Sequence, residues 1–284
     1  MTTIDAPAPV LDLSGERTPI GVLLRDLFRH RDLLRMLAMQ DFRGRYRSAS
    51  LGLAWSVLLP VLQGVVIGFV FSHIIGGGKT GTYAPYVIIG TTTWSYLQQS
   101  LNAASSSIVD NGQIAGRIYF PRLTLPAVPP TANLPGLLIS MGVAEVVTLS
   151  AGLGIHLTIL LVPAVVALAW TLITSLGALA TMAHVYSRDV RYIVQASMLV
   201  LFYATPIIYR LDSQGGIKAL PSALRPLVIA NPFSGVIELA RYALLGEADA
   251  LVPTVASTIG WTVALAIAAV LVFSRFERVA CDRL

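Results

Sequence analysis

Charge and cysteine are both scarce in this sequence. Only 12% of the 284 residues are charged while 55% are hydrophobic, and the mean hydropathy is +0.72. A soluble domain carries about 25% charged residues, so this composition excludes a soluble fold and indicates a membrane protein. The single cysteine, Cys281, has no partner within the chain, which excludes an internal disulfide framework and a cysteine-based zinc site.

Period-two alternation is absent from the long apolar runs, which argues against strands. Runs of about 20 apolar residues match the length at which a helix crosses roughly 30 Å of hydrocarbon. Their leucine, alanine and glycine content suits packed transmembrane helices. We therefore expect an all-α polytopic membrane protein with six transmembrane helices, at about 51–75, 83–104, 126–154, 157–184, 192–210 and 253–274.

The remaining segments complete the expected organisation. Residues 1–19 lack a basic region followed by a short apolar core, so they predict a flexible cytoplasmic tail and not a cleaved signal peptide. Residues 20–47 predict an N-terminal amphipathic interface helix, because leucines recur at helical spacing among arginines. Residues 48–274 are expected to form the membrane domain, and residues 275–284 a second cytoplasmic tail.

Arginine and lysine are distributed unevenly between the two sides of the expected bundle. Short loops rich in these residues stay on the cytoplasmic side. With the N-terminus inside, fifteen of the 20 basic residues lie in inner segments, so we expect both termini in the cytoplasm. The net charge of +5 then reflects topology and attraction to anionic lipid, and it gives no support to nucleic-acid binding.

The outer segment 211–252 is longer than a typical connector. Within it, a short helix is indicated by a plausible N-cap, a proline in the first turn, an apolar face, an i, i+3 ion pair and a C-terminal glycine: Asn231, Pro232, Phe233, Glu238, Arg241 and Gly246. Together with the preceding LRPLVIA, this helix predicts an outer re-entrant helical hairpin at about 220–246. A loop that merely covers the bundle is the alternative.

Nucleotide and metal chemistry are not supported by the sequence. GGGKT at 76–80 ends like a phosphate-binding loop, but His73 stands where the pattern needs a glycine, and the segment follows a span and not a strand. The four histidines are scattered and show no metal-ligand spacing. We expect no catalytic residue, no metal and no cofactor in this chain, so any ATP-driven work must come from another polypeptide.

Polar and aromatic side chains inside the expected spans are few. Glu145 could relay a proton or bond a neighbouring helix, and the lack of a basic partner in the other spans favours the helix contact.

In the second span, hydroxyls and amides recur on one helical face, toward protein or water: Thr91, Ser95, Gln98, Asn102 and Ser105. Aromatic residues near span ends could form interfacial belts or a sugar-stacking lining: Trp55, Trp94, Tyr96, Phe202, Tyr203 and Tyr209. Pro206 should kink or end the fifth span.

Five segments, taken in order, resemble the ABC-2 type membrane subunits that export polysaccharides, including O-antigen and teichoic-acid exporters. They are RDLLRMLAMQDFRGRYRSASLGLAWSVLLP, NGQIAGRIYFPRLTLP, RDVRYIVQ, YATPIIY and NPFSGVIELARYALLG, and the resemblance covers about 20–280. It implies a half-transporter of the bacterial plasma membrane that pairs with a second copy of itself and with two ATP-binding cassette subunits, which hold ATP and magnesium. The cargo it implies is a lipid-linked polysaccharide. Because the chain is rich in arginine and alanine, as in high-GC bacteria, we expect a galactan of the mycobacterial type.

The resemblance also implies roles for particular residues. The ATPase-facing surface would comprise Arg35, Arg43, Arg45, Arg47, Arg117, Arg122, Arg188, Asp189 and Arg191. Substrate would be admitted near Ser50, Leu51, Gly52 and Trp55 and pass Thr91, Ser95, Gln98, Asn102, Phe202, Tyr203 and Tyr209. The outer gate would comprise Asn231, Pro232, Phe233, Glu238 and Arg241.

Two other functions stay open on the sequence. An ABC-2 exporter of small molecules or drugs would share this architecture with a narrower pore. A polytopic membrane transferase would need a cluster of His, Asp or Glu at one membrane face, which the sequence does not show. Sequence also does not separate processive movement of the glycan from flipping of the whole lipid-linked molecule.

Overall fold

The computed structural model describes residues 31–46, 54–74, 83–111, 122–211 and 223–281. Within these ranges the chain forms helices and turns and contains no strand, which confirms the expected all-α class. The elements are α2 (Arg31–Tyr46), α3 (Ala54–Ile74), α4 (Tyr83–Ala104), α5 (Ser107–Asp110), α7 (Thr124–Ser150), the 3-10 turn η1 (Leu157–Leu161), α8 (Val162–Tyr186), α9 (Val190–Ala204), α10 (Arg225–Ala230), α11 (Ser234–Leu245) and α12 (Leu251–Cys281).

Several of these helices are suited to a membrane. Among the described residues, three are long and apolar enough to cross one: Thr124–Ser150, Leu157–Tyr186 and Leu251–Arg275. Two shorter apolar helices, Ala54–Val70 and Val190–Ala204, accompany them. Helix α4 has 22 residues but is less apolar, because hydroxyl and amide side chains interrupt it.

Helix α9 is shorter than the span expected at 192–210. It ends at Ala204 because Thr205 is extended (ψ 142°) and Pro206 follows. The Thr205 hydroxyl donates a 2.6 Å hydrogen bond to the Leu201 carbonyl in the last turn. The expectation that Pro206 ends or kinks this helix is therefore confirmed, and the described residues 205–211 are not helical.

Helix α12 is longer than expected. It runs to Cys281, past the predicted end of the sixth span at 274, so most of the described part of the predicted C-terminal tail is helical. The predicted N-terminal tail and the first third of the predicted interface helix lie outside the described residues. The part of the interface helix that is described is α2.

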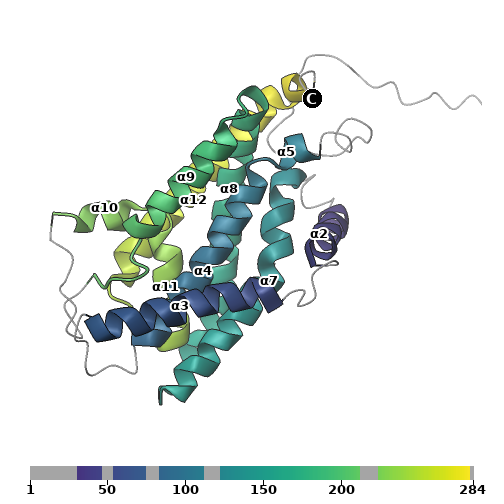
Figure 1. The fold of residues 1–284 in the computed structure, drawn as a ribbon. Helices are drawn as coiled ribbons and strands as arrows, with labels where there is room; N and C mark the ends of the chain where they lie inside the picture. The colour runs from purple at the N-terminus through teal and green to yellow at the C-terminus, as the bar shows by residue number, and fades with distance from the viewer. Residues whose placement is uncertain (1–30, 47–53, 75–82, 112–121, 212–222, 282–284) are drawn as a thin grey trace, which may run out of the picture.

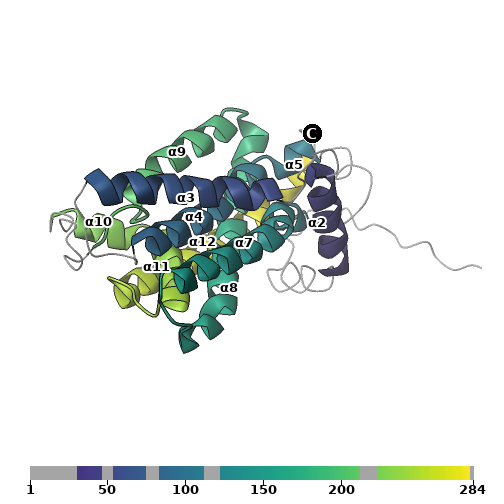
Figure 2. The same ribbon diagram turned by 60° about the horizontal axis from the view of Figure 1, so that its bottom comes forward.

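The helices are arranged with two distinct ends. In both ribbon views α2 and α10 lie at opposite ends of the molecule, and α3 crosses the α4–α7 pair obliquely in Figure 1 (Figures 1 and 2). Helices α4, α7, α8 and α11 surround the larger hydrophobic core. A smaller cluster joins Leu33 and Leu37 of α2 to Leu125 and Phe273. This second cluster fixes α2 against the bundle.

Small residues set the closest helix contacts. A Cβ atom placed on Gly177 would lie 2.6 Å from the Cβ of Ala104, so the backbone of α8 packs directly on the methyl group of Ala104 in α4. A Cβ on Gly235 would lie 2.4 Å from the Thr254 carbonyl oxygen, which brings α11 equally close to α12. No larger side chain fits at either position without moving a helix.

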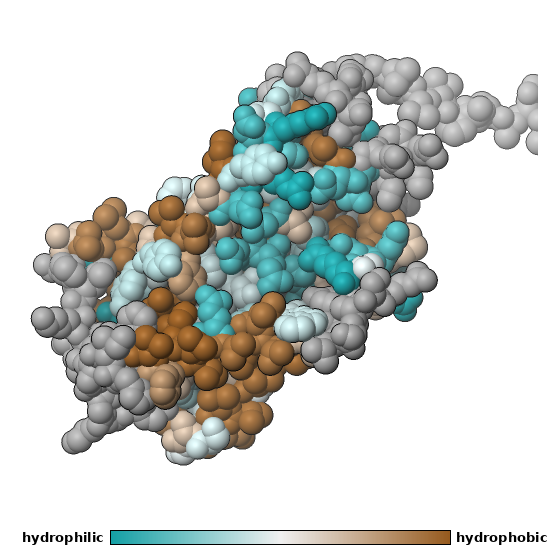
Figure 3. All heavy atoms as spheres, viewed as in Figure 1, coloured by the Kyte–Doolittle hydropathy of each residue, from teal (hydrophilic) through white to brown (hydrophobic). Residues whose placement is uncertain are grey.

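Exposed apolar side chains cover much of α3 and α9. Leu59, Leu62 and Phe69 of α3 are 56%, 52% and 64% exposed. Leu199 and Val200 of α9 are exposed as well. Contiguous apolar surface of this kind suits hydrocarbon or another subunit. Figure 3 shows it over α3, beside a hydrophilic band that runs from the α5 end toward the middle of the same face.

Candidate functional site

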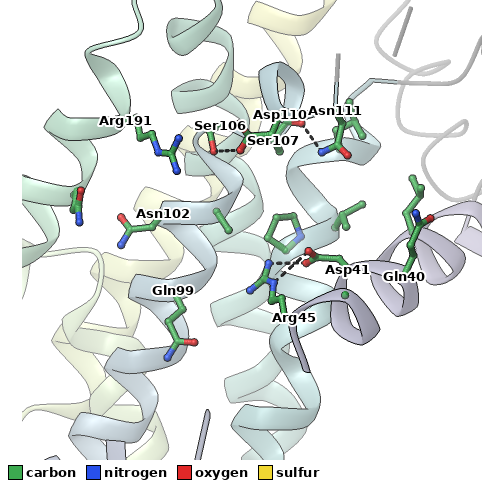
Figure 4. A pocket seen from close by; sticks show the side chains of 17 residues that line it. Gln40, Asp41, Arg45, Gln99, Asn102, Ser106, Ser107, Asp110, Asn111 and Arg191 are labelled. Atoms are coloured by element: carbon green, nitrogen blue, oxygen red, sulfur yellow. Dashed lines mark hydrogen bonds and ion pairs between the residues drawn. The ribbon is translucent and has the colours of Figure 1, made fainter. Parts of the chain in front are cut away.

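A polar cavity of about 880 Å³ opens between α2, α4, α5, α7 and α9 (Figure 4). Its walls carry arginines, aspartates, amides and hydroxyls, among them Asp41, Arg45, Gln99, Asn102, Asp110 and Arg191. Arg45 comes from α2 and Arg191 from α9, on different walls. We call this space the polar cavity. Such a lining can hydrogen-bond a hydroxyl-rich ligand and can attract an anionic one.

One wall of the polar cavity is built by a chain of side-chain contacts that we call the Arg45 chain. Arg45 forms an ion pair of 2.6 Å with Asp41, one turn earlier on α2. Its Nη1 donates to Oδ1 of Asn133 on α7 (3.0 Å), and Nδ2 of Asn133 donates to the Ser100 hydroxyl on α4 (2.9 Å). Asn133 is 8% exposed and Ser100 is fully buried. The Arg45 chain therefore links three helices.

The opposite wall is a tight turn between α4 and α5. The Ser106 hydroxyl donates to Asp110 (2.6 Å), and Asn111 Nδ2 donates to the Ser107 carbonyl (2.8 Å). The backbone N–H of Ile108 donates to the hydroxyl of Thr181 on α8 (3.1 Å). These bonds satisfy the polar groups of the turn and hold its carboxylate at the rim of the polar cavity.

A second, much smaller polar gap continues from the polar cavity between α3, α4 and α7. Its volume is about 20 Å³, and Gln99 lines both spaces. Besides Gln99, its lining includes hydroxyls and a second amide: Ser56, Thr92, Ser95, Asn133 and Ser140. Polar surface thus extends from the polar cavity along α4 into the apolar bundle, which agrees with the hydrophilic band of Figure 3.

The other end of the molecule contains a largely buried ionic network that we call the Arg241 cluster: Arg241, Glu238, Tyr86 and Asp249. Arg241 and Glu238 form a 2.8 Å ion pair with both side chains 0% exposed. The guanidinium lies 3.4 Å from the centroid of the Tyr86 ring and donates to the Tyr86 hydroxyl (2.7 Å). Burial raises the pKa of Glu238, and the charge of Arg241 opposes that rise.

The Arg241 cluster holds the non-helical stretch after α9. Arg241 Nη2 donates to the carbonyl of Ile207 (2.9 Å), and the Tyr86 hydroxyl donates to that of Tyr209 (3.2 Å). Asp249 accepts the backbone N–H of Leu211 (2.9 Å). Groups of α4 and α11 therefore take the place of the helical hydrogen bonds that this stretch lacks.

The residues predicted to face an ATPase lie at the α2 end. Arg35 and Arg43 are exposed on α2, and Arg188, Asp189 and Arg191 are exposed at the turn between α8 and α9. Arg122 is half-buried just before α7. Arg45 differs, because its guanidinium points into the molecule to Asp41 and Asn133. Arg47 and Arg117 lie outside the described residues.

The predicted substrate path is divided among several places. Asn102 lines the polar cavity and Ser95 the small polar gap. Thr91 is buried, and its hydroxyl lies 3.0 Å from the Val87 carbonyl of its own helix and 3.3 Å from the Pro60 carbonyl of α3. Gln98 and Ser105 line neither space, and Trp55 is exposed on α3. Phe202 contacts Trp94 and Tyr203, while Tyr209 lines an apolar groove beside α10. Ser50, Leu51 and Gly52 lie outside the described residues.

Helix α11 agrees with the prediction at its C-terminal half. The pairing of Glu238 with Arg241 is confirmed, as is the C-terminal cap at Gly246, whose φ is 71°. The predictions of Asn231 as N-cap and of Pro232 in the first turn were wrong, because α11 begins at Ser234. Asn231 instead accepts the N–H of Phe233 (3.0 Å) and donates to Thr205 (2.8 Å), which closes a turn before the helix.

Sequence reasoning missed three residues of these sites. Asn133 stands in an otherwise apolar run, and that was a signal for a buried hydrogen bond. Tyr86 and Asp249 carried no such signal, because each resembles an ordinary interfacial residue until the fold brings it to Arg241.

Glu145 has no hydrogen-bond partner for its buried carboxylate oxygens among the described residues.

Comparison with known proteins identifies the family. Residues 32–245 match the ABC-2 type transporter family. The chain is 26% identical over 208 residues to the O-antigen export system permease protein RfbA of Myxococcus xanthus, covering 72% of this chain and 80% of that relative. A protein of the same name from Klebsiella pneumoniae is 24% identical over 207 residues, covering 72% of this chain and 77% of the relative. Because the family match extends from α2 to the end of α11, this protein belongs to the ABC-2 type transporter family.

Proposed function

We propose that this chain is the membrane subunit of an ATP-driven exporter that moves a lipid-linked polysaccharide across the bacterial plasma membrane. The observation that carries the proposal is the polar cavity with its continuation along α4. Space lined by amides, carboxylates and arginines within an apolar bundle suits a hydroxyl-rich cargo and not an apolar drug. The relatives named as O-antigen export permeases support the same class of cargo.

The topology we propose has six spans and both termini in the cytoplasm. Helices α3, α4 and α9 join α7, α8 and α12 as spans, and α10 with α11 forms the outer re-entrant hairpin. At 1.5 Å per residue, the 21 residues of α3 rise about 32 Å, enough for the hydrocarbon layer. The polar cavity then opens to the cytoplasm and the Arg241 cluster lies at the outer side.

The partners we propose are a second copy of this chain and two ATP-binding cassette subunits, which hold ATP and magnesium. The apolar faces of α3 and α9 are available to the second copy or to lipid. Charged residues at the α2 end and the α8–α9 turn are the surface that we propose for the ATPase: Arg35, Arg43, Arg122, Arg188, Asp189 and Arg191, together with Arg47 and Arg117, which lie outside the described residues.

The substrate path we propose begins near residues 50–55 and the polar cavity and follows α4 toward the α10–α11 hairpin. Cargo of the O-antigen, teichoic-acid or galactan type carries many hydroxyls and an anionic lipid linkage. Arg45 and Arg191 supply positive charge at the cavity where that linkage would arrive. The hairpin acts as the outer gate, anchored by the Arg241 cluster.

Reconstitution tests the proposal. The chain is purified with its ATPase subunit, placed in liposomes and supplied with radiolabelled lipid-linked oligosaccharide. ATP-dependent movement of the label supports the proposal, whereas drug efflux without movement of the label contradicts it. Arg43→Glu combined with Arg47→Glu should weaken co-purification of the ATPase by about tenfold without preventing insertion, and unchanged co-purification contradicts the proposed ATPase surface.

A further inference from the structure

We propose that Asn133 is the joint through which α2 moves the α4 wall of the polar cavity. The proposal rests on the proposed function in one respect, namely that a partner ATPase acts on α2. Asn133 is then a positioning residue: it acts on the polar cavity through Ser100 and sets the width of that cavity.

The side-chain amide of Asn133 makes one hydrogen bond through its oxygen and another through its nitrogen. Its oxygen accepts from Arg45 of α2 at 3.0 Å, and its nitrogen donates to Ser100 of α4 at 2.9 Å. A leucine at this position would fill similar volume and make neither bond. An aliphatic contact would also let α2 slide along α7, whereas two directed hydrogen bonds fix the relative position of the three helices.

Burial makes the bond between Asn133 and Ser100 resistant to stretching. Asn133 is 8% exposed and Ser100 is fully buried, so water has little access to that bond, whereas the bond from Arg45 is part-buried. An unpaired buried amide is costly, so a shift that reaches Asn133 through Arg45 is passed on to Ser100. A displacement of α2 is therefore passed through the Arg45 chain to α4.

Asp41 holds the Arg45 side chain in the orientation that contacts Asn133. The carboxylate accepts from both Nε (3.2 Å) and Nη2 (2.6 Å) of Arg45, a two-pronged contact that leaves Nη1 directed at Asn133. A lone arginine near the end of an interface helix would extend toward lipid phosphate groups. The pair explains why Arg45 points inward when Arg35 and Arg43 do not.

Helix α7 bends most easily around Asn133, where it meets the Arg45 chain. Pro129, Pro130 and Pro135 lie inside the helix around Asn133. Each lacks the N–H that would bond the carbonyl four residues earlier, and helices bend at such positions. A displacement delivered at Asn133 therefore reaches α7 in the segment that deforms with least resistance.

The moved element is the wall of the polar cavity itself. Gln99, Asn102 and Ala103, which flank Ser100 on α4, line the polar cavity. A shift of Ser100 therefore carries these three side chains with it. In this way the position of α2 determines how far the polar cavity is open.

The test follows the polar cavity without needing any cargo. In the complex with its ATPase subunit, Cys281→Ser removes the native thiol and Gln99→Cys places a reporter on the α4 wall. We expect ATP to change the reaction rate of that thiol with a membrane-impermeant maleimide. Asn133→Leu and Ser100→Ala should each reduce this ATP response by about fivefold or more, with co-purification of the ATPase unchanged.

Tyr96→Phe is the matched control. The Tyr96 hydroxyl donates to the Pro130 carbonyl at 3.1 Å, so its removal breaks a bond between α4 and α7 that does not reach α2. It should leave the ATP response at the wild-type value. An equal loss in Tyr96→Phe, a wild-type response in Ser100→Ala, or no ATP response in the otherwise unaltered reporter protein would each overturn the proposal.

Two features of the experiment ensure that its outcome either supports or contradicts the proposal. If Asn133→Leu does not fold, Ser100→Ala alone decides the outcome, because it removes one hydroxyl and leaves Asn133 in place. The readout is also independent of the cargo. Failure to export polysaccharide in liposomes contradicts the proposed function, while an unaffected thiol response in Ser100→Ala contradicts the role of Asn133.

Discussion

The polar cavity and the Arg241 cluster are built from similar groups in opposite surroundings. Each has an arginine paired with a carboxylate on its own helix, at i, i+4 for Arg45 and i, i+3 for Arg241. The first pair is about a third exposed, and the second is 0% exposed. Water can replace a contact of Arg45 but not one of Arg241. One end of the molecule can therefore rearrange, while the other is fixed.

Removing the arginine of the fixed end should have the largest effect on stability. Arg241→Met leaves Glu238 buried without its partner, so we expect a loss of about 3–5 kcal/mol in the free energy of unfolding. Thermal unfolding of the detergent-solubilised protein measures it. Glu238→Leu added to Arg241→Met should recover part of the loss, since no unpaired charge remains. A loss below about 1 kcal/mol would show that the two ends do not differ.

A milder change in the Arg241 cluster should have a smaller effect. Tyr86→Phe keeps the ring beneath the guanidinium and removes the hydroxyl that contacts Tyr209 and Arg241. We expect a loss of about 1–3 kcal/mol, because buried polar groups lose a partner. The same unfolding measurement applies. Tyr242→Phe removes a half-buried hydroxyl from α11 outside the cluster and serves as the control.

The corresponding change at the polar cavity should barely alter stability. Arg45→Gln removes a partly exposed ion pair and one hydrogen bond to Asn133. After allowance for solvent screening, we expect a loss of at most about 1 kcal/mol in the free energy of unfolding. A loss as large as that of Arg241→Met would contradict the proposed contrast between the two ends.

Filling the polar cavity should leave stability unchanged and reduce function. Gln99→Trp adds a ring to the exposed part of the α4 wall, so it displaces water and not packed side chains. We expect an unchanged unfolding temperature and a large loss of ATP-dependent polysaccharide movement in liposomes. Leu138→Trp adds the same ring to the exposed face of α7 and should retain transport. Equal transport by both variants would remove the polar cavity from the cargo path.

The sequence predicted local features well and long-range ones poorly. The i, i+3 spacing of Glu238 and Arg241, the glycine cap at Gly246 and the break at Pro206 depend on neighbouring residues, and all three were confirmed. Tyr86 lies 155 residues before Arg241, so only the packing of α4 against α11 brings them together.

Arg45 shows the same limit within the predicted interface helix. The family resemblance implied a place for Arg45 on the ATPase-facing surface, but Asp41 and Asn133 direct its side chain inward. The hydroxyl and amide face predicted on α4 was likewise divided by its neighbours. Thr91 is buried where α4 meets α3, while Asn102 borders the polar cavity. Helical periodicity assigns a face to a residue, and the adjacent helices decide what that face meets.

The early end of α9 has a consequence for the bilayer. Its 15 residues rise about 22 Å, against roughly 30 Å for a typical hydrocarbon layer. With α9 as a span, as we propose, lipids beside it would meet a wall shorter than their own apolar thickness, and such a mismatch favours local thinning of the membrane. A polar polymer that leaves along this side would then cross a thinner hydrocarbon layer.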